Sequence, residues 1–299
     1  MRSTPSGSST TSSAAERGRR FAVQGPPDRS NKPDFPWWLL AAGAIALFLA
    51  VQIVLDDLYS QIFQIVSKGV GITIFVTLTG FTLATAIGLL LAVMGLSRFL
   101  VLRQVARFYV EIIRGIPILV LLFYIAFVGA PGFVVAWNLV AAPLIERGLV
   151  EPLSVRDVSL LWRAIIALTI GYSAFIAEVF RAGILSVDSG QVEAAKALGL
   201  TPLQRFRFIV LPQAIRTILP PLGNDFIAMI KDSSLVSVLG VADLTQMGKV
   251  YASGSFRFFE TYSIVAYVYL LLTVGLSLGL RALEKRLRRS DEERGARSG

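Results

Sequence analysis

The sequence has neither cysteine nor histidine among its 299 residues. Their absence excludes disulfide bonds, thiolate nucleophiles, Cys/His metal sites and proton relays that run through imidazole. Charge is also scarce: 16% of the residues are charged and 54% are hydrophobic, whereas a soluble domain carries about 25% charged residues. Together with a mean hydropathy of +0.65, this composition indicates an integral membrane protein.

The net charge of +9 does not indicate a nucleic-acid-binding protein, because the basic residues are not gathered in one groove-like segment. Of the 29 Lys and Arg residues, 6 lie in residues 1–36 and 7 in residues 281–299, and most of the others fall between apolar runs. Basic residues that flank apolar spans are retained on the cytoplasmic side of a membrane. We therefore expect membrane lipid, and no nucleic acid, among the partners of this chain.

Six apolar runs are candidates for transmembrane helices, each of which needs about 20 mostly apolar residues. They are residues 37–55, 69–97, 115–130, 162–184, 216–240 and 261–281. Pro131-Gly132 follows the third run and is expected to interrupt the helix. Residues 133–145 are then expected to form a shorter, half-inserted segment.

The distribution of Lys and Arg predicts how these spans are oriented. With both termini in the cytoplasm, 20 basic residues lie on the cytoplasmic side and 6 on the outer side. This asymmetry favours an even number of spans, because a seventh would move the basic 186–216 loop outside. The predicted fold class is an all-α integral membrane protein with six transmembrane helices and both termini cytoplasmic.

The most informative cytoplasmic loop is residues 191–216, between the fourth and fifth spans. Residues 193–198 favour a helix, and Gly199 stands where a helix ends in a left-handed cap. Residues 201–204 have the pattern of a capping box with proline at the first helical position, and Pro212 closes or kinks this second helix. The loop is therefore predicted to be a helix–glycine–helix unit that is too polar to cross the bilayer.

The same loop contains a spaced motif: Glu193-Ala194-Ala195, three residues, Gly199, nine residues and then Ile209-Val210-Leu211-Pro212. At every defined position this motif is similar to the EAA loop of ATP-binding-cassette (ABC) importer permeases. The resemblance implies that the short helix is a coupling helix, which docks into a separate ATPase and transmits its closure to the membrane helices. The residues implied in ATPase coupling are Glu193, Ala194, Ala195, Gly199, Ile209, Leu211 and Pro212.

Two further segments resemble this family. Residues 111–119 are similar to its E-x-x-R-G-x-P-x-L signature, and residues 199–235 are similar to the subfamily that imports polar amino acids of the His, Glu, Gln, Arg or opine type. The resemblance covers roughly residues 69–283, the expected permease domain. Outside it we expect three segments: a disordered cytoplasmic tail at 1–36, an extra N-terminal transmembrane helix at 37–57 and a basic cytoplasmic tail at 284–299.

Charged residues inside membrane spans are costly and commonly mark a transport pathway. Asp225 and Asp232 are seven residues apart, which is about 10.5 Å of helix rise. Asn224 and Lys231 have the same spacing, so that one helix face can present both an acid and a cation to a zwitterion. The candidate path residues are Arg114, Glu178, Asn224, Asp225, Lys231 and Asp232.

The charges within the spans have an equally consistent second interpretation. Glu178 with Arg181, and Lys231 with Asp232, can neutralise one another, set helix packing and touch no solute. Arg114 has the same ambiguity, because Glu111 lies three residues before it on the same helix.

The sequence lacks a phosphate-binding GxxxxGK[ST] motif, because the spacing from Gly240 to Gly248-Lys249 is wrong and valine follows the lysine. The chain is therefore expected not to be the ATPase itself. The resemblance implies that it is not an enzyme and binds no cofactor, ATP and magnesium being held by a partner. The resemblance implies a permease subunit in the cytoplasmic membrane of a prokaryote. Its implied partners are nucleotide-binding ATPase subunits, a second permease, either identical or homologous, and an extracytoplasmic solute-binding protein. The alternative is an ion- or proton-coupled secondary transporter that uses Glu178 and Asp225, although no internal repeat supports it.

Overall fold

The computed structural model describes residues 37–297, which form helices and no strand. The chain divides into two units, of which the first ends at Ile45 and the second begins at Ala46. α2 (Trp37–Leu55) is a helix of 19 residues with the bounds of the first predicted span. The predicted tail at 1–36 lies outside the described residues.

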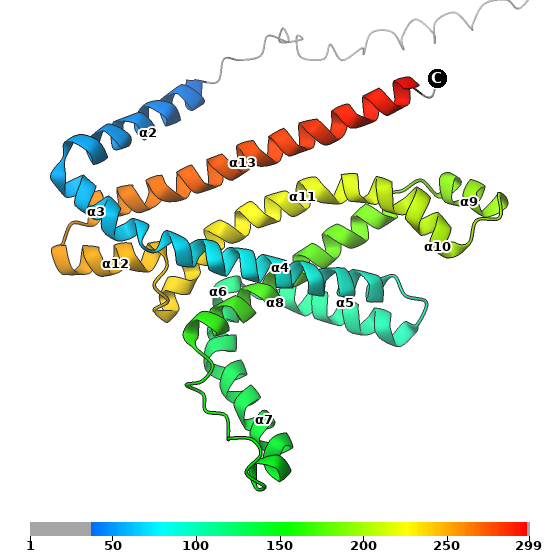
Figure 1. Ribbon diagram of the computed structural model, residues 1–299, viewed down its shortest axis with the longest axis horizontal. Helices are drawn as coiled ribbons and strands as arrows, with labels where there is room; N and C mark the ends of the chain where they lie inside the picture. The colour runs from blue at the N-terminus through cyan, green and yellow to red at the C-terminus, as the bar shows by residue number, and fades with distance from the viewer. Residues whose placement is uncertain (1–36, 298–299) are drawn as a thin grey trace, which may run out of the picture. The chain divides into compact units, whose positions relative to one another are not determined.

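The second unit contains the remaining helices (Figure 1). They are α3 (Asp57–Ser67), α4 (Val70–Gly95), α5 (Leu100–Arg114), α6 (Ile118–Tyr124), the π-helical turn η2 (Ile125–Gly129), α7 (Ala130–Ile145), α8 (Leu160–Leu185), α9 (Ser189–Ala197), α10 (Pro202–Arg205), the π-helical turn η3 (Phe206–Val210), α11 (Leu211–Asp232), the 3-10 helix η4 (Ser233–Leu239), α12 (Leu244–Ser255) and α13 (Phe258–Arg297). The expected all-α architecture is confirmed for the described residues.

Four stretches of these helices are long and apolar enough to cross a membrane. They are Asp57–Gly95, Ile118–Ile145, Leu160–Leu185 and Phe258–Ala282. The apolar stretch Leu40–Leu55 of α2 is shorter, and α11 is more polar because it carries Arg216, Asp225, Lys231 and Asp232. Each predicted span thus lies on a helical segment, while the count of six membrane crossings stays a prediction.

The expectation that Pro131-Gly132 breaks the third span is wrong, because residues 118–145 form one uninterrupted helical run. The π-helical turn η2 accommodates the proline. In a π-helical turn each carbonyl pairs with the N–H five residues later, as Ile125 does with Ala130. The carbonyl of Ala126 would therefore pair with residue 131, but proline has no N–H to donate. Arg163 on α8 donates from Nη1 to this carbonyl at 3.0 Å instead, so a guanidinium replaces the missing backbone donor.

The centre of the second unit is the contact between α4 and α8, which run parallel. A Cβ atom at Gly80 would lie 3.9 Å from Leu168 Cβ, and one at Gly88 would lie 2.8 Å from Ile176 Cγ2. The step from Gly80 to Gly88 on α4 is thus matched by an equal step from Leu168 to Ile176 on α8, so both helices run in the same direction. Small residues allow helices to approach closely in membranes, where lipid tails are as apolar as the core.

α11 packs antiparallel to α8. A Cβ atom at Gly183, near the end of α8, would lie 2.3 Å from Ile218 Cγ1 near the start of α11. At the other end of the contact, the hydroxyl of Tyr172 donates to Asp232 Oδ2 at 2.7 Å. α8 is consequently packed against α4 on one side and α11 on another, which makes it the central helix of the unit.

α3, α12 and α13 form a second apolar cluster, which includes Ile62, Leu244 and Ile264. The buried carboxylate of Asp243 caps α12 by accepting from the N–H groups of Thr245 and Gln246. Burial raises the pKa of this carboxyl, and these bonds oppose the rise. The hydroxyl of Tyr269 on α13 also donates to Asp243, at 3.3 Å, which ties α12 to α13.

Candidate functional site

The α9–α10 loop has the local structure that the sequence predicts. α9 ends at Ala197, and Gly199 is left-handed with φ +79°. The N–H of Leu200 bonds the carbonyl of Ala195 at 3.1 Å, which satisfies a carbonyl at the end of α9. Thr201 and Gln204 form a complete capping box around the start of α10. These bonds join residues close in sequence, so the unit is defined by its own chain segment.

The predicted coupling residues differ in their accessibility. Ala195 is only 4% exposed and packs inside the chain, whereas Glu193 and Ala194 are exposed. Leu198, which the sequence analysis did not single out, is 80% exposed beside them. α9 therefore presents a small, partly apolar surface, and Ala195 holds the helix in place rather than forming part of that surface.

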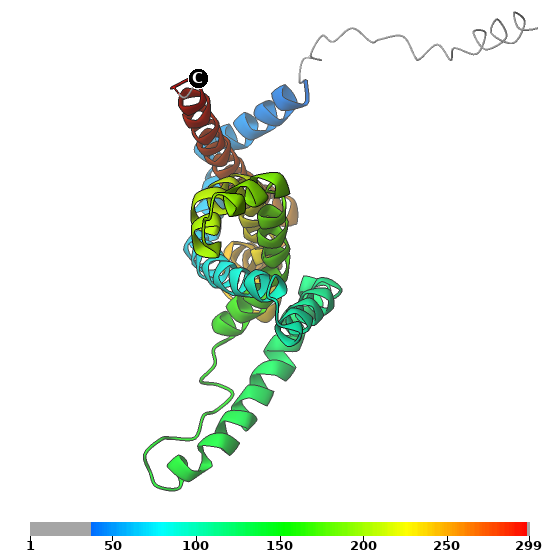
Figure 2. The same ribbon diagram turned by 90° about the vertical axis from the view of Figure 1, so that its right-hand side faces the viewer.

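Two connections join this loop to α11. The side-chain amide of Gln213 donates to Gln191 Oε1 at 2.7 Å, which bridges α9 and α11. The helical run also passes from α10 through η3 into α11, and Pro212 lies in the first turn of α11. Pro212 thus follows the π-helical turn without ending the helical run, and α10 is continuous with α11. In Figure 2, which faces that end of the molecule, the yellow-green loop segment lies toward the viewer.

A cavity of about 480 Å³ lies between α5, α8 and α11. It is lined by Arg114, Phe175, Glu178, Val179, Ala182, Gly183, Ser186, Thr217, Pro221 and Asp225. Three of the six candidate path residues, Arg114, Glu178 and Asp225, therefore come together from three different helices. The sequence analysis missed the polar groups of Ser186 and Thr217, whose hydroxyls lie 3.4 Å apart.

The charges in this cavity are partly paired. Arg181 forms a two-pronged ion pair with Glu178, including a bond from Nε to Oε2 of 2.9 Å. Arg114 lies over the ring of Phe175, 5.7 Å from its centroid, and forms no ion pair with Glu111 among the described residues. Asp225 Oδ2 is buried without a hydrogen-bond partner within the described part of the chain. The cavity thus contains a carboxylate oxygen without a hydrogen-bond partner and a guanidinium without an ion pair among the described residues.

The other three candidate path residues lie elsewhere on α11. Asp232 accepts a hydrogen bond from Tyr172, whereas Asn224 and Lys231 are exposed. Lys231 and Asp232 form no ion pair among the described residues. The four residues of the predicted α11 face therefore divide into two pairs, of which the aspartates turn toward α8 and the other two do not.

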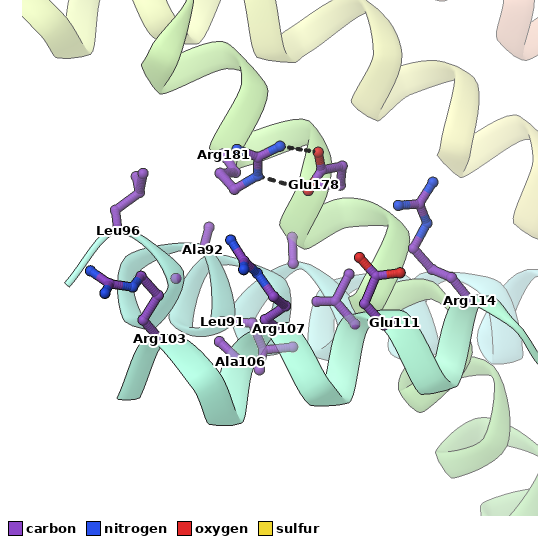
Figure 3. A pocket seen from close by; sticks show the side chains of 13 residues that line it. Leu91, Ala92, Leu96, Arg103, Ala106, Arg107, Glu111, Arg114, Glu178 and Arg181 are labelled. Carbon is purple, nitrogen blue, oxygen red and sulfur yellow. Dashed lines mark hydrogen bonds and ion pairs between the residues drawn. The ribbon is translucent and has the colours of Figure 1, made fainter. Parts of the chain in front are cut away.

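A second cavity of about 380 Å³ lies beside the first and shares Arg114 and Glu178 with it. Figure 3 shows Arg103, Arg107, Glu111 and Arg114 projecting into it from α5. The sequence analysis did not single out Arg103 or Arg107. The signal was available, because charges at 103, 107, 111 and 114 recur at helical spacing along one face.

The part of the chain that the structure describes contains no group of Asp and Glu side chains arranged to hold a metal ion.

Comparison with known proteins identifies the family. A family profile described as "Binding-protein-dependent transport system inner membrane component" matches residues 84–289. The chain is 38% identical to the probable amino-acid permease protein YxeN of Bacillus subtilis, over 72% of this chain and 88% of that protein. It is 36% identical to the glutamine transport system permease protein GlnP of Escherichia coli, over 74% of this chain and 92% of that protein.

Solved structures show the same fold. An amino acid ABC transporter, crystallised with histidines, matches 76% of this chain and 95% of its own with a TM-score of 0.62 and 37% identity. The MetNI methionine ABC transporter matches with a TM-score of 0.54 and 21% identity, covering 78% of this chain and 98% of that one, and supports the fold alone. The resemblance to ABC importer permeases in the 193–212 segment is thereby confirmed at the level of the family. The chain belongs to the family of binding-protein-dependent transport system inner membrane components.

Proposed function

We propose that this chain is the permease subunit of an ABC importer that moves a polar amino acid across the cytoplasmic membrane of a prokaryote. The observation that carries the proposal is the extent of the family match, residues 84–289. This range includes the α9–α10 loop and every residue that lines the larger cavity. The two relatives named above are called a probable amino-acid permease and a glutamine transport permease, and their sources are bacteria.

The proposed topology has six crossings with both termini in the cytoplasm. α4 and α8 run parallel, and α11 runs antiparallel to α8. Two parallel spans need an odd number of crossings between them, and the uninterrupted run Ile118–Ile145 supplies one. This agreement supports counting residues 118–145 as a single span. The proposed domains are an added helix at 37–57, a permease domain at 69–283 and cytoplasmic tails at 1–36 and 284–299.

The proposed coupling element is the α9–α10 loop. Glu193, Ala194 and Leu198 are exposed for contact with an ATPase. Gly199 and the buried Ala195 fix the shape of the loop, while Ile209, Leu211 and Pro212 lie where it continues into α11. ATP and magnesium act on the partner ATPases, whose closed state binds ATP better and so shifts the permease toward one side of the membrane. A second permease and an external solute-binding protein complete the proposed assembly.

The proposed substrate path runs through the cavity between α5, α8 and α11. A zwitterion needs a counter-charge for its ammonium and another for its carboxylate. The unpartnered Asp225 carboxylate and the Arg114 guanidinium line the same cavity and offer both. Asn224 and Lys231 would extend the path along the exposed side of α11, and Asp232 would keep α11 on α8 through Tyr172.

Uptake into vesicles tests the proposed function. The chain is purified with its native partners, reconstituted, and supplied with the copurifying binding protein and a panel of radiolabelled amino acids. We expect uptake of a polar amino acid that requires ATP on the side of the membrane where the ATPases lie. This uptake should persist when a proton ionophore collapses the proton gradient. Uptake that follows the gradient without ATP would overturn the proposal in favour of ion-coupled transport.

A further inference from the structure

α5 has its apolar face outward. Val101, Val105 and Phe108 are 72%, 52% and 70% exposed on one side of the helix. The opposite side carries Arg103 and Arg107, which line the smaller cavity (Figure 3). In a soluble protein the apolar side of such a helix packs on the core. An outward apolar side is matched to lipid, and charged side chains at membrane depth then face a cavity.

The smaller cavity has an excess of cations. Arg181 is neutralised by its ion pair with Glu178. Arg103, Arg107 and Glu111 have neither a hydrogen bond nor an ion pair from their side chains within residues 37–297. Arg114 lies over the ring of Phe175 and attracts Glu178 at a distance, without an ion pair among the described residues. Three guanidinium groups therefore face one carboxylate, which suits an anion better than a zwitterion.

The rest of the lining is apolar. Leu91, Ala92, Leu96, Ala106, Val110 and Ala177 contribute it from α4, α5 and α8. A cavity with apolar walls and a cationic mouth fits an amphipathic anion better than a fully hydrated one. The larger cavity differs, since it contains the unpartnered carboxylate of Asp225.

The depth of the arginines matches a lipid headgroup. Arg181 lies four residues before the end of α8 at Leu185, which is about 6 Å along the helix. In the proposed topology that end of α8 is cytoplasmic, so the mouth of the cavity lies at the level of the inner headgroups. Basic pockets between membrane helices on the cytoplasmic side bind anionic lipid headgroups.

We propose that this cavity binds the phosphate headgroup of an anionic phospholipid from the cytoplasmic leaflet. Arg103 and Arg107, one helical turn apart on α5, contact the phosphate. The acyl chains lie against the apolar walls of the same cavity, near Leu91 and Val110. The leaflet assignment rests on the proposed function, whereas binding itself is measured without transport, so that either can fail alone.

Lipid binding to the purified full-length chain tests the site. Delipidated protein is titrated with phosphatidylglycerol and, separately, with phosphatidylcholine of identical acyl chains, and bound lipid is counted by native mass spectrometry. We expect tighter binding of phosphatidylglycerol. Arg103→Gln and Arg107→Gln should each weaken that binding about fivefold, since one arginine at a membrane surface contributes about 1 kcal/mol. Arg103→Lys should keep most of the affinity, because it keeps the charge.

Arg98→Gln is the matched control, because Arg98 stacks on Phe99 near the same end of α4 and does not line the cavity. An equal loss in Arg98→Gln would mean general surface attraction and would overturn the site. Unchanged binding in the Arg103 and Arg107 variants would also overturn it. If millimolar inorganic phosphate displaced bound phosphatidylglycerol as completely as added lipid does, the cavity would be a site for a soluble anion instead. Thermal stability and gel filtration of each variant establish that it is folded.

Discussion

The α9–α10 loop and the α8–α11 contact both involve α11 but are held by different kinds of interaction. In the loop, the cap of Asp188, the turn at Gly199 and the box of Thr201 with Gln204 all join residues within a few positions of one another. Across α8 and α11, Gly183 meets Ile218 and Tyr172 bonds Asp232, 35 and 60 residues apart in sequence. A locally stabilised unit can move as one piece. A contact between distant segments, in contrast, changes whenever the two helices shift relative to one another.

The largest effect should come from making the loop unable to turn at Gly199. We expect Gly199→Val to lower ATP-driven uptake by at least about tenfold, since a left-handed conformation costs a β-branched residue about 1–3 kcal/mol and α9 must shift to avoid it. ATP hydrolysis by the partner should persist. Uptake and hydrolysis are measured together in vesicles.

Gly254→Val serves as its control, because a Cβ at Gly254 meets no atom within 4 Å and its φ is not in the positive range that is unfavourable for side chains. Normal coupled uptake by Gly199→Val would remove the loop from the coupling mechanism.

The next effect tests the contact between distant segments. Gly183→Val should destabilise the protein by about 1–3 kcal/mol through overpacking, because a Cβ there would lie 2.3 Å from Ile218 Cγ1. Its midpoint of thermal unfolding in detergent should fall by several degrees. Gly275→Val, on an open face of α13, should leave the midpoint unchanged. Equal midpoints for the two variants would show that α8 and α11 separate without cost.

A moderate effect is expected at the cavity. Asp225→Asn removes a charge from the cavity and keeps the size of the side chain. We expect the KM for amino-acid uptake to rise about tenfold, as for the loss of one charge-assisted hydrogen bond of about 1.5 kcal/mol, with basal ATP hydrolysis preserved. Asp57→Asn, on the exposed surface of α3, provides the comparison. Unchanged uptake kinetics would assign Asp225 to helix packing.

The smallest effect should be at the start of α10. Thr201→Ala removes the hydroxyl that accepts from the N–H of Gln204 and should cost about 1 kcal/mol of local stability. Hydrogen exchange of the α10 amides should accelerate about fivefold, while exchange in α8 stays unchanged. Faster exchange in both helices would mean that the loop and the helix contact are not independent units.

The sequence predicted the parts of this protein whose causes lie close together in the chain. Membrane residence follows from the scarcity of charge, and the loop follows from residues that cap and turn their own helices. The prediction failed at Pro131, because the donor that replaces its missing N–H belongs to Arg163, 32 residues later. A proline signals a lost hydrogen bond, but nothing in the local pattern states which distant side chain restores it.

The site shows the same division. The four polar residues Asn224, Asp225, Lys231 and Asp232 on α11 could be found from their spacing, which allowed all of them to share a face. Only the packing of α11 on α8 turned Asp225 and Asp232 toward α8 and left Asn224 and Lys231 exposed. The sequence by itself determined that this is a membrane protein, where its helices lie and how the α9–α10 loop turns, since these depend on composition and short-range bonds. The tertiary structure alone decided which charges share a cavity, because that depends on the direction and close approach of helices that are distant in sequence.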